Sequence, residues 1–192
     1  MNTETKEFKD LRLQDDVYLF VKKKIMEELD EHNSALFIGK FRIFTKKHFQ
    51  IISEALNSHK FVFVTIIKGE KSDKISLSFE SKKKLLEEEF GDRVIVLEHS
   101  NGYLPSIIKK CYLRVKTIYA GSDRIEGYRK QFKGRNLPFE FIEINRDDEI
   151  SATSTIQAII DNDEKRFNLY VPKILENRLS EIKEKLNIVE DT

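Results

Sequence analysis

Residues 34–48 are SALFIGKFRIFTKKH, and the change of pattern within this stretch decides the expected fold. The apolar run from Ser34 to Gly39 is typical of a short buried strand. Helical spacing of apolar residues then begins at Thr45 and continues to Leu56. A strand, a loop rich in cations and a helix therefore follow one another along this part of the chain.

The same alternation recurs in the rest of the chain. Further strands are expected at residues 61–67, 94–97, 117–121 and 139–142. Helices are expected at residues 12–31, 79–90, 103–113, 124–132 and 174–186, and another helix opens at residues 155–160. Strands that alternate with helices form parallel sheets that are covered on both faces. We therefore expect an α/β protein with a Rossmann-like three-layer α/β/α fold and a five-stranded parallel sheet.

The length of the chain favours one domain with additions at its ends. A chain of 192 residues buries roughly 70% of its unfolded surface, and two full domains do not suit this length. We expect an N-terminal extension with one helix at residues 1–33 and the main domain at residues 34–175. Residues 176–192 are expected to form a C-terminal helix that packs on the same domain.

The composition argues against several classes of protein. Lys and Arg number 34 and Asp and Glu number 33, so the chain lacks the basic excess of a duplex-binding protein. Cys111 is the single cysteine, and the four histidines lack the spacing of zinc ligands, so no protein metal site is expected. The chain begins without the apolar core of a secretory signal, and no apolar run approaches the length of a membrane span. These features predict a soluble, cytoplasmic protein without a membrane partner.

The loop after Gly39 is the first candidate site. It is not a P-loop, because Phe41 follows where a hydroxyl residue is required. Its cations are Lys40, Arg42, Lys46 and Lys47. They lie near a helix N-terminus, which favours phosphate. In the alternative interpretation Thr45 caps the helix, the lysines are solvated and His48 is only packed. A third interpretation is a nucleic-acid binder that uses these cations, with an affinity that falls steeply with salt.

Three segments resemble the signatures of the HxGH nucleotidyltransferase superfamily, which includes nicotinamide-mononucleotide and phosphopantetheine adenylyltransferases and cytidylyltransferases. Residues 39–48 resemble its Gly-x-Phe-x-Pro-x-His/Thr-x-Gly-His loop. Residues 120–124, AGSDR, are similar to its Gly-Ser-Asp segment. Residues 150–159, ISATSTIQAI, resemble the second signature, Ile-Ser-Ser-Thr-x-Ile-Arg. The resemblance keeps the order of the signatures and covers roughly residues 34–175.

This resemblance implies an NTP-dependent nucleotidyltransferase of the adenylyl- or cytidylyltransferase type. Such an enzyme joins a nucleoside monophosphate to a phosphorylated small molecule and releases pyrophosphate. The implied partners are ATP or CTP, accompanied by Mg²⁺, and a phosphorylated small-molecule acceptor. Nucleic acid is not expected as a partner, and self-association is left open.

The resemblance also implies roles for individual residues. His48 would donate to the α-phosphate oxygens, and Thr45 would bind phosphate. Ser151 and Thr153 would hold the β- and γ-phosphates, and Asp123 would face the nucleoside. The implied catalytic residues are His48, Thr45 and Lys46. The implied nucleotide-binding residues are Gly39, Lys40, Phe41, Lys47, Gly121, Ser122, Asp123, Arg124, Ser151, Thr153 and Ser154.

The chain departs from the signatures at three positions. Lys47 replaces the glycine before the second histidine, and Ile43 replaces the proline. Ile156 stands at the arginine that holds the terminal phosphates, and the loss of such a contact costs on the order of 1.5–3 kcal/mol. Lys46, Lys47 or Arg124 could supply the missing charge. The alternative function is therefore a catalytically impaired nucleotide-binding module with a structural or regulatory role.

Other polar residues are weighed against ordinary structural roles. Lys82 and Lys83 belong to a Lys/Glu-rich helix, where charge pairs at helical spacing indicate a solvated face. Either lysine, or Lys68 at a strand end, is an alternative contact for the phosphate of the acceptor. Cys111 is expected to be an inert buried thiol.

Overall fold

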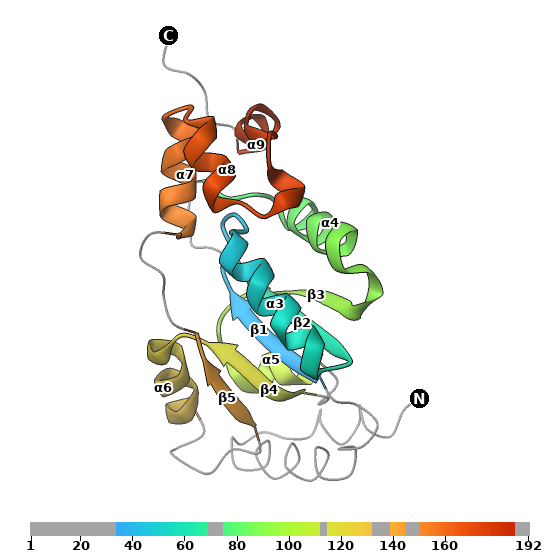
Figure 1. Ribbon diagram of the computed structural model, residues 1–192. Coiled ribbons are helices and arrows are strands. Elements are labelled where there is room, and N and C mark those ends of the chain that lie inside the picture. Colours follow the sequence, from blue (N-terminus) through green and yellow to red (C-terminus); the bar gives the residue numbers. More distant parts are fainter. Residues whose placement is uncertain (1–33, 69–74, 112–114, 132–138, 145–149, 187–192) are drawn as a thin grey trace.

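The computed structural model describes residues 34–68, 75–111, 115–131, 139–144 and 150–186 (Figure 1). The helix expected at residues 12–31 and the N-terminal extension at residues 1–33 lie outside the described residues.

The described strands form one parallel sheet in the order β3-β2-β1-β4-β5. The strands are β1 (Ser34–Gly39), β2 (Phe61–Ile67), β3 (Val94–His99), β4 (Val115–Ala120) and β5 (Glu140–Glu143). The strand order reverses between β1 and β4, and ligands bind beyond the carboxyl ends of strands at such a point. The expected five-stranded parallel sheet is confirmed.

Helices cover both faces of this sheet (Figure 1). The α-helices are α3 (Lys46–Ser58), α4 (Phe79–Phe90), α5 (Leu104–Lys110), α6 (Ser122–Gln131), α7 (Ala152–Ile160), α8 (Glu164–Tyr170) and α9 (Leu179–Lys185). Two short 3₁₀ turns are η1 (Gly91–Arg93) and η2 (Lys173–Leu175). Helices α3 and α4 lie on one face, α5 and α6 on the other, and α7 to α9 gather beyond the carboxyl ends of the strands. The expected Rossmann-like three-layer α/β/α fold is confirmed.

The alternation of side chains along β1 explains the two layers of helices. Leu36 and Ile38 belong to an apolar cluster that includes residues of α5 and α6. Ala35 and Phe37 belong to a second cluster, which includes residues of α3 and α4. Because successive residues of a strand point to opposite faces, the apolar run of β1 supplies both cores.

A third apolar cluster holds the C-terminal helices. It combines residues of α7, α8 and α9 with Ile43, Leu77 and Leu85. Ile43 belongs to the loop between β1 and α3, so this loop packs against the C-terminal helices. None of the described helices is long and apolar enough to cross a membrane.

One expected helix is wrong as a single element. Residues 174–186 were expected to be continuous, but η2 ends at Leu175 and α9 begins at Leu179. Asn177 between them has a φ of 60°, in the left-handed region that interrupts a helix. Asn168 fixes this turn, since its Oδ1 accepts from the Asn177 backbone N–H at 2.8 Å.

The other differences are shifted ends of elements and one additional helix. Helix α7 begins at Ala152 and not at residue 155, because Ser151 caps it. Strand β3 continues through His99, where backbone pairing outlasts the apolar run. Helix α8 was not expected, and its signal was Asp163, whose side chain accepts from the Arg166 backbone N–H at 3.0 Å.

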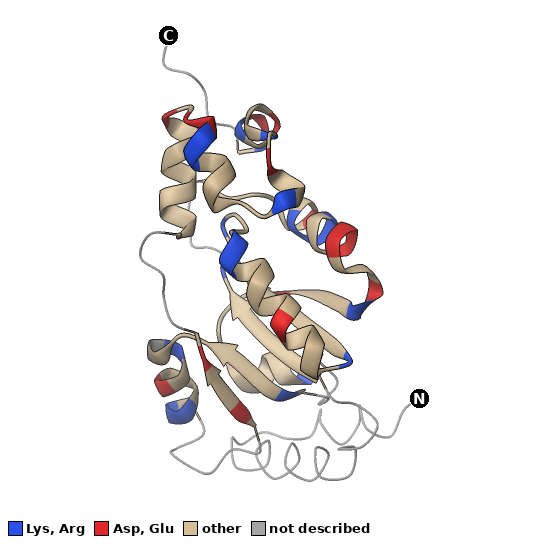
Figure 2. Ribbon diagram, viewed as in Figure 1, with Lys and Arg blue, Asp and Glu red and all other residues tan. Residues whose placement is uncertain are grey.

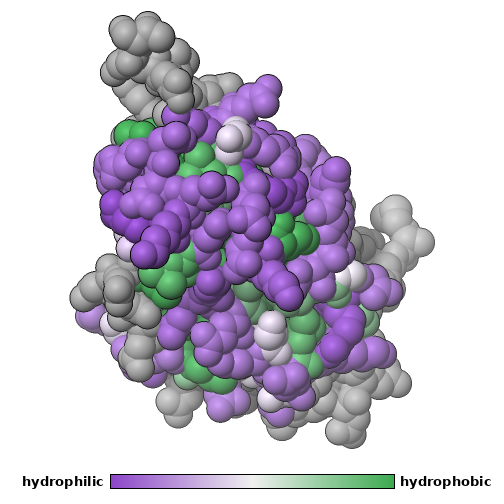
Figure 3. Space-filling model, turned by 45° about the horizontal axis from the view of Figure 1, so that its top comes forward, coloured by the Kyte–Doolittle hydropathy of each residue, from purple (hydrophilic) through white to green (hydrophobic). Residues whose placement is uncertain are grey.

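Charge is distributed as expected for a solvated surface. Figure 2 shows Lys, Arg, Asp and Glu mainly on the helices, whereas most of the sheet carries other residues. On the face shown in Figure 3, hydrophilic residues dominate and hydrophobic residues are visible only in small separate areas. Cys111 is fully buried, and burial raises the pKa of its thiol, in agreement with an inert role.

Candidate functional site

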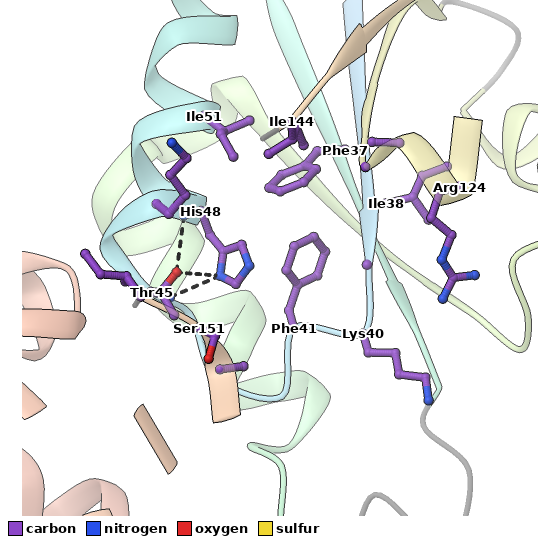
Figure 4. A pocket seen from close by; sticks show the side chains of 16 residues that line it. Phe37, Ile38, Lys40, Phe41, Thr45, His48, Ile51, Arg124, Ile144 and Ser151 are labelled. Carbon is purple, nitrogen blue, oxygen red and sulfur yellow. Dashed lines mark hydrogen bonds between the residues drawn. The ribbon is translucent and has the colours of Figure 1, made fainter. Parts of the chain in front are cut away.

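A cavity of about 460 Å³ lies where the strand order reverses, at the carboxyl ends of β1 and β4. Its volume suits a small organic ligand. The expected site residues that line it are Gly39, Lys40, Phe41, Thr45, Lys47, His48, Gly121, Arg124 and Ser151. Segments that are far apart in the sequence therefore meet at one pocket, as Figure 4 shows.

The apolar wall of the pocket was not expected from the sequence. It includes Phe37, Ile38, Ile51 and Ile144. Their apolar character indicated a core role, and the side chains of Phe37, Ile38 and Ile51 are indeed largely buried. Only Ile38, which directly precedes Gly39, had a signal for the pocket in the sequence.

Gly39 and Phe41 determine the course of the loop that begins the site. A β-carbon at Gly39 would lie 2.8 Å from Cζ of Phe41, so the absence of a side chain leaves room for the ring. Phe41 has a φ of 44°, which is rare for a bulky residue. Its ring stacks on Phe44 at 5.2 Å and meets the ring of His48 edge-on at 5.1 Å. These contacts hold the strained loop in place.

Thr45 and His48 form a capping box at the start of α3. The Thr45 backbone N–H donates to Nδ1 of His48 at 3.1 Å, and the His48 backbone N–H bonds to Oγ1 of Thr45 at 3.5 Å. Because Nδ1 accepts, the proton of the neutral imidazole lies on Nε2. Figure 4 shows that Nε2 points away from Thr45, into the pocket beside Phe41. The imidazole therefore presents a hydrogen-bond donor to a ligand.

His48 is neutral at pH 7. Desolvation by burial lowers its pKa to about 4. The aromatic neighbours Phe37, Phe41 and Phe44 account for the apolar surroundings. A neutral imidazole still donates through Nε2, and an anionic ligand would favour its protonated form.

Thr45 has the capping role that the alternative interpretation gave it. Its side chain is buried, and its hydroxyl lies 3.1 Å from Nδ1 of His48. The hydroxyl is thus engaged inside the capping box, and the direct phosphate contact expected from the resemblance stays a prediction. Thr45 orients His48.

A second capping box opens α7, which also borders the pocket. The Ser151 backbone N–H donates to Oγ of Ser154 at 2.9 Å, and the Ser154 backbone N–H donates to Oγ of Ser151 at 3.0 Å. Ser151 and Ala152 line the pocket. Among the described residues, the backbone N–H groups of Ala152 and Thr153 have no recorded partner. The first turns of α3 and α7 therefore both contribute to the pocket wall.

The titratable side chains among the described lining residues are basic, apart from the neutral His48. Lys40, Lys47 and Arg124 contribute to its wall, and no Asp or Glu is among the described lining residues. Lys47 occupies the first turn of α3, so a lysine is accommodated where the resembled motif has glycine. Arg124 lies close to the backbone of Gly102, whose added β-carbon would be 3.5 Å from Nη1. The site therefore favours an anionic ligand.

Several expected site residues do not line the pocket. Lys46 instead donates to the Asn168 carbonyl at 3.0 Å and pairs with Glu176 at 3.5 Å. Ser154 serves the α7 cap. Thr153 accepts from Arg42.

Two expected residues lie in the first turn of α6. Ser122 is exposed there and does not line the pocket. The side chain of Asp123 lies outside what the structure describes.

Two departures from the resembled motifs fall in one apolar cluster. Ile43 is fully buried, and Ile156 is 5% exposed. Both belong to the cluster that joins the loop to the C-terminal helices. Ile156 is therefore part of the packing behind the pocket, and an arginine at this position would have to enter an apolar environment.

Lys82 lies under the loop, although the sequence favoured a solvated position. Its side chain donates to Oγ of Ser76 at 2.9 Å and to the carbonyl of Lys40 at 3.4 Å. Only 5% of Lys82 is exposed, and desolvation lowers its pKa to about 8. The signal for burial was its spacing from Leu85 and Leu86, which lie on the inner face of α4.

The neighbouring lysines follow the expectation of a solvated helix face. Lys83 pairs with Glu87 at 3.8 Å, and Lys84 pairs with Glu88 at 3.7 Å. Lys68 is exposed and pairs with Glu98 at 3.2 Å. No group of three or more His, Cys, Asp or Glu that could hold a metal ion occurs in the part of the chain that the structure describes.

Solved structures with similar folds were found. A bifunctional NMN adenylyltransferase/ADP ribose pyrophosphatase from Francisella tularensis matches with a TM-score of 0.58 at 18% identity, over 80% of this chain and 50% of that chain. Such an enzyme in complex with AMP and Mn ion, from the same organism, has a TM-score of 0.49 at 19% identity, over 81% of this chain and 52% of that chain. The pantoate-beta-alanine ligase of that organism has a TM-score of 0.46 at 11% identity, over 86% and 84% of the two chains.

These comparisons concern the fold. The chain spans about half the length of the bifunctional enzyme that it matches. No protein-family model matches the sequence, and no curated protein matches it. The first likeness shows that the α/β/α fold of this chain is shared with part of a bifunctional NMN adenylyltransferase/ADP ribose pyrophosphatase.

Proposed function

We propose that the chain is an NTP-dependent nucleotidyltransferase that binds ATP or CTP in this pocket. The observation that carries the proposal is the pair of capped helices, α3 and α7, whose first turns both line the pocket that holds His48, where no described lining residue is a carboxylate. Helix N-termini and lysine side chains stabilise phosphate oxygens. The shared fold of an adenylyltransferase supports the same reaction class.

In the proposed reaction, a phosphate oxygen of the acceptor attacks the α-phosphorus of the nucleoside triphosphate in line. The new bond joins this oxygen to the α-phosphorus, and the bond to the oxygen that bridges to the β-phosphate breaks. Pyrophosphate leaves with the electron pair of that bond. His48 donates from Nε2 to a non-bridging oxygen of the α-phosphate as negative charge develops there, and Lys47 adds positive charge. Catalysis rests on positioning and charge stabilisation.

The proposed Mg²⁺ accompanies the triphosphate. The described lining residues include no carboxylate, the usual protein ligand of this cation, so they do not form a Mg²⁺ site of their own. Mg²⁺ bound to the phosphates neutralises part of their charge. The residues of the chain bind the phosphate oxygens that remain.

The second candidate function is a nucleotide-binding module without turnover. It is favoured by Ile156, which belongs to the apolar cluster, and by Lys46, which is engaged by Asn168 and Glu176. In this interpretation neither residue contacts the phosphates. Such a module would bind nucleotide and leave it intact.

The test is the release of pyrophosphate from each nucleoside triphosphate with Mg²⁺, across a panel of phosphorylated acceptors. The proposal expects release that depends on one acceptor class and falls at least a hundredfold in His48→Asn. The control is His59→Asn, since His59 bonds to Thr117 inside the fold and does not line the pocket. Nucleotide binding without release under every condition would favour the second candidate.

A further inference from the structure

Arg42 does not itself line the pocket, but it directly follows the lining residue Phe41 and joins the loop after β1 to the start of α7. Its Nη2 donates to Oγ1 of Thr153 at 3.0 Å. Its neighbour Phe41 and the neighbour of Thr153, Ala152, both line the pocket. We infer that Arg42 binds the terminal phosphates of the nucleoside triphosphate, an inference that rests on the proposed function.

The backbone of Arg42 is fixed from a third segment. Its carbonyl accepts from the Leu77 backbone N–H at 2.9 Å and from Oγ of Ser76 at 3.4 Å. Arg42 is therefore held at its backbone by Ser76 and Leu77, before α4, and at its guanidinium by Thr153. A fixed guanidinium loses less conformational freedom when it binds a ligand.

The guanidinium keeps donors for a ligand. An arginine has five N–H donors in a planar fork that matches phosphate oxygens. Among the described residues, the single recorded partner of the Arg42 guanidinium is the Thr153 hydroxyl, and no carboxylate pairs with it. A cation that uses few of its donors within the described part of the chain, close to a pocket whose described lining holds no carboxylate, is suited to an anion.

The guanidinium groups of two other arginines, Arg178 and Arg93, have different partners. Arg178 makes two hydrogen bonds to the carboxylate of Glu181. Arg93 donates to backbone carbonyls at the ends of α3 and β2, among them that of Leu56 at 2.7 Å. These two guanidinium groups complete contacts inside the fold, whereas that of Arg42 bonds to a single hydroxyl among the described residues.

The geometry also explains how the site tolerates Ile156. That residue follows the first turn of α7 and packs into the apolar cluster. Arg42 reaches the same turn from the opposite loop and brings a guanidinium to Thr153. The charge for the terminal phosphates therefore comes from the loop and not from the helix.

The test compares the affinities of the triphosphate and the monophosphate of the same nucleoside, measured by calorimetry with Mg²⁺. Arg42→Gln is expected to weaken the affinity for the triphosphate about ten- to hundredfold. The affinity for the monophosphate is expected to change less than about twofold. Thr153→Val keeps Arg42 but removes the hydroxyl that accepts from it. We expect this variant to lose less affinity for the triphosphate than Arg42→Gln does. Arg166→Gln is the matched control, since Arg166 pairs with Asp161 at the C-terminal end of α7, the opposite end of the helix from Thr153.

Each result bears on the inference separately. Equal losses for triphosphate and monophosphate in Arg42→Gln would overturn it, because Arg42 would then only stabilise the loop. So would a triphosphate affinity in Arg42→Gln that equals that of Arg166→Gln. If the wild-type chain binds no nucleotide at all, the proposed function fails first. Circular dichroism of each variant confirms that the fold is kept.

Discussion

The backbone N–H of Thr45 donates to Nδ1 of His48 at 3.1 Å, and this contact links the cap of α3 to the chemistry of the pocket. It fixes the tautomer of the imidazole, because a nitrogen that accepts cannot carry the proton. It also directs Nε2 into the pocket (Figure 4). The structural and the functional interpretations of His48 are therefore two consequences of one hydrogen bond.

Substitution of His48 by Asn or by Ala separates these consequences. The Oδ1 of Asn can accept from Thr45 in place of Nδ1, so His48→Asn keeps the cap and loses the donor at Nε2. We expect its turnover to fall by a factor of about 10²–10³ with little change in stability. His48→Ala loses the cap as well, and its free energy of unfolding should fall by a further ~1 kcal/mol. Chemical denaturation and pyrophosphate release measure the two effects, and equal stability of the two variants would refute the capping role.

The pH dependence of stability reports the burial of His48. Its pKa of about 4 in the folded state is below the ordinary value of 6.5, so the unfolded chain binds more protons between these pH values. The free energy of unfolding should therefore decrease as the pH falls from 6.5 to 4, by up to about 3 kcal/mol. Urea unfolding at several pH values checks this. In His48→Asn this part of the decrease should vanish, and an unchanged slope would assign it to other groups.

Gly39 and Phe41 are expected to be coupled. Gly39→Ala places a β-carbon against a ring that Phe37, Phe44 and His48 hold, and should cost about 1–3 kcal/mol. In the double variant with Phe41→Leu the crowding is smaller. The double variant should therefore lose less unfolding free energy than the two single variants lose together. A double-mutant cycle of unfolding free energies measures this coupling, and strict additivity would argue against the contact.

Lys82→Met tests a charge that the fold buries under the loop. Desolvation lowers the pKa of Lys82 to about 8, below its usual 10.5, so at pH 7 the side chain stays mostly charged and its burial costs free energy on folding. Removal of the charge should raise the free energy of unfolding by on the order of 1 kcal/mol. The affinity for a triphosphate should fall, because the Lys40 carbonyl loses its donor and the loop its charge. A variant that is less stable yet binds nucleotide normally would contradict this account.

Ile156→Arg restores the residue of the resembled motif but is not expected to restore its function. The position is 5% exposed and belongs to an apolar cluster. A buried guanidinium without a partner should cost at least about 2 kcal/mol of unfolding free energy. Thermal unfolding measures this loss. A stable variant that binds triphosphate more tightly would show that the side chain turns toward the pocket.

The parts of the fold that were predictable are those with a strong local pattern. The apolar run of β1 and the helical spacing after Thr45 led to the correct elements and to the capping residue. Asn177 was not recognised as a break, because the apolar residues on both sides keep a helical spacing across it. Its left-handed backbone depends on contacts with Asn168, which the linear sequence does not reveal.

The candidate site was predictable to a similar degree. Motif order placed His48, Ser151 and Arg124 at one pocket, because strand ends of a parallel sheet lie at one edge. The direction of a long side chain was not predictable. Lys46 turns toward Glu176, whereas Lys82 turns inward beneath the loop, and only tertiary contacts decide between such rotamers.

The central claim is that this pocket binds a nucleoside triphosphate. The most direct measurement is thermal unfolding of the full chain with Mg²⁺ and each of ATP, CTP, GTP and UTP. At a hundred times its dissociation constant, a ligand adds about 2.7 kcal/mol, which should raise the midpoint by roughly 5–10 °C for a chain of this size. We expect such a shift with ATP or CTP, reduced in Arg42→Gln. The absence of a shift with all four triphosphates would contradict the account.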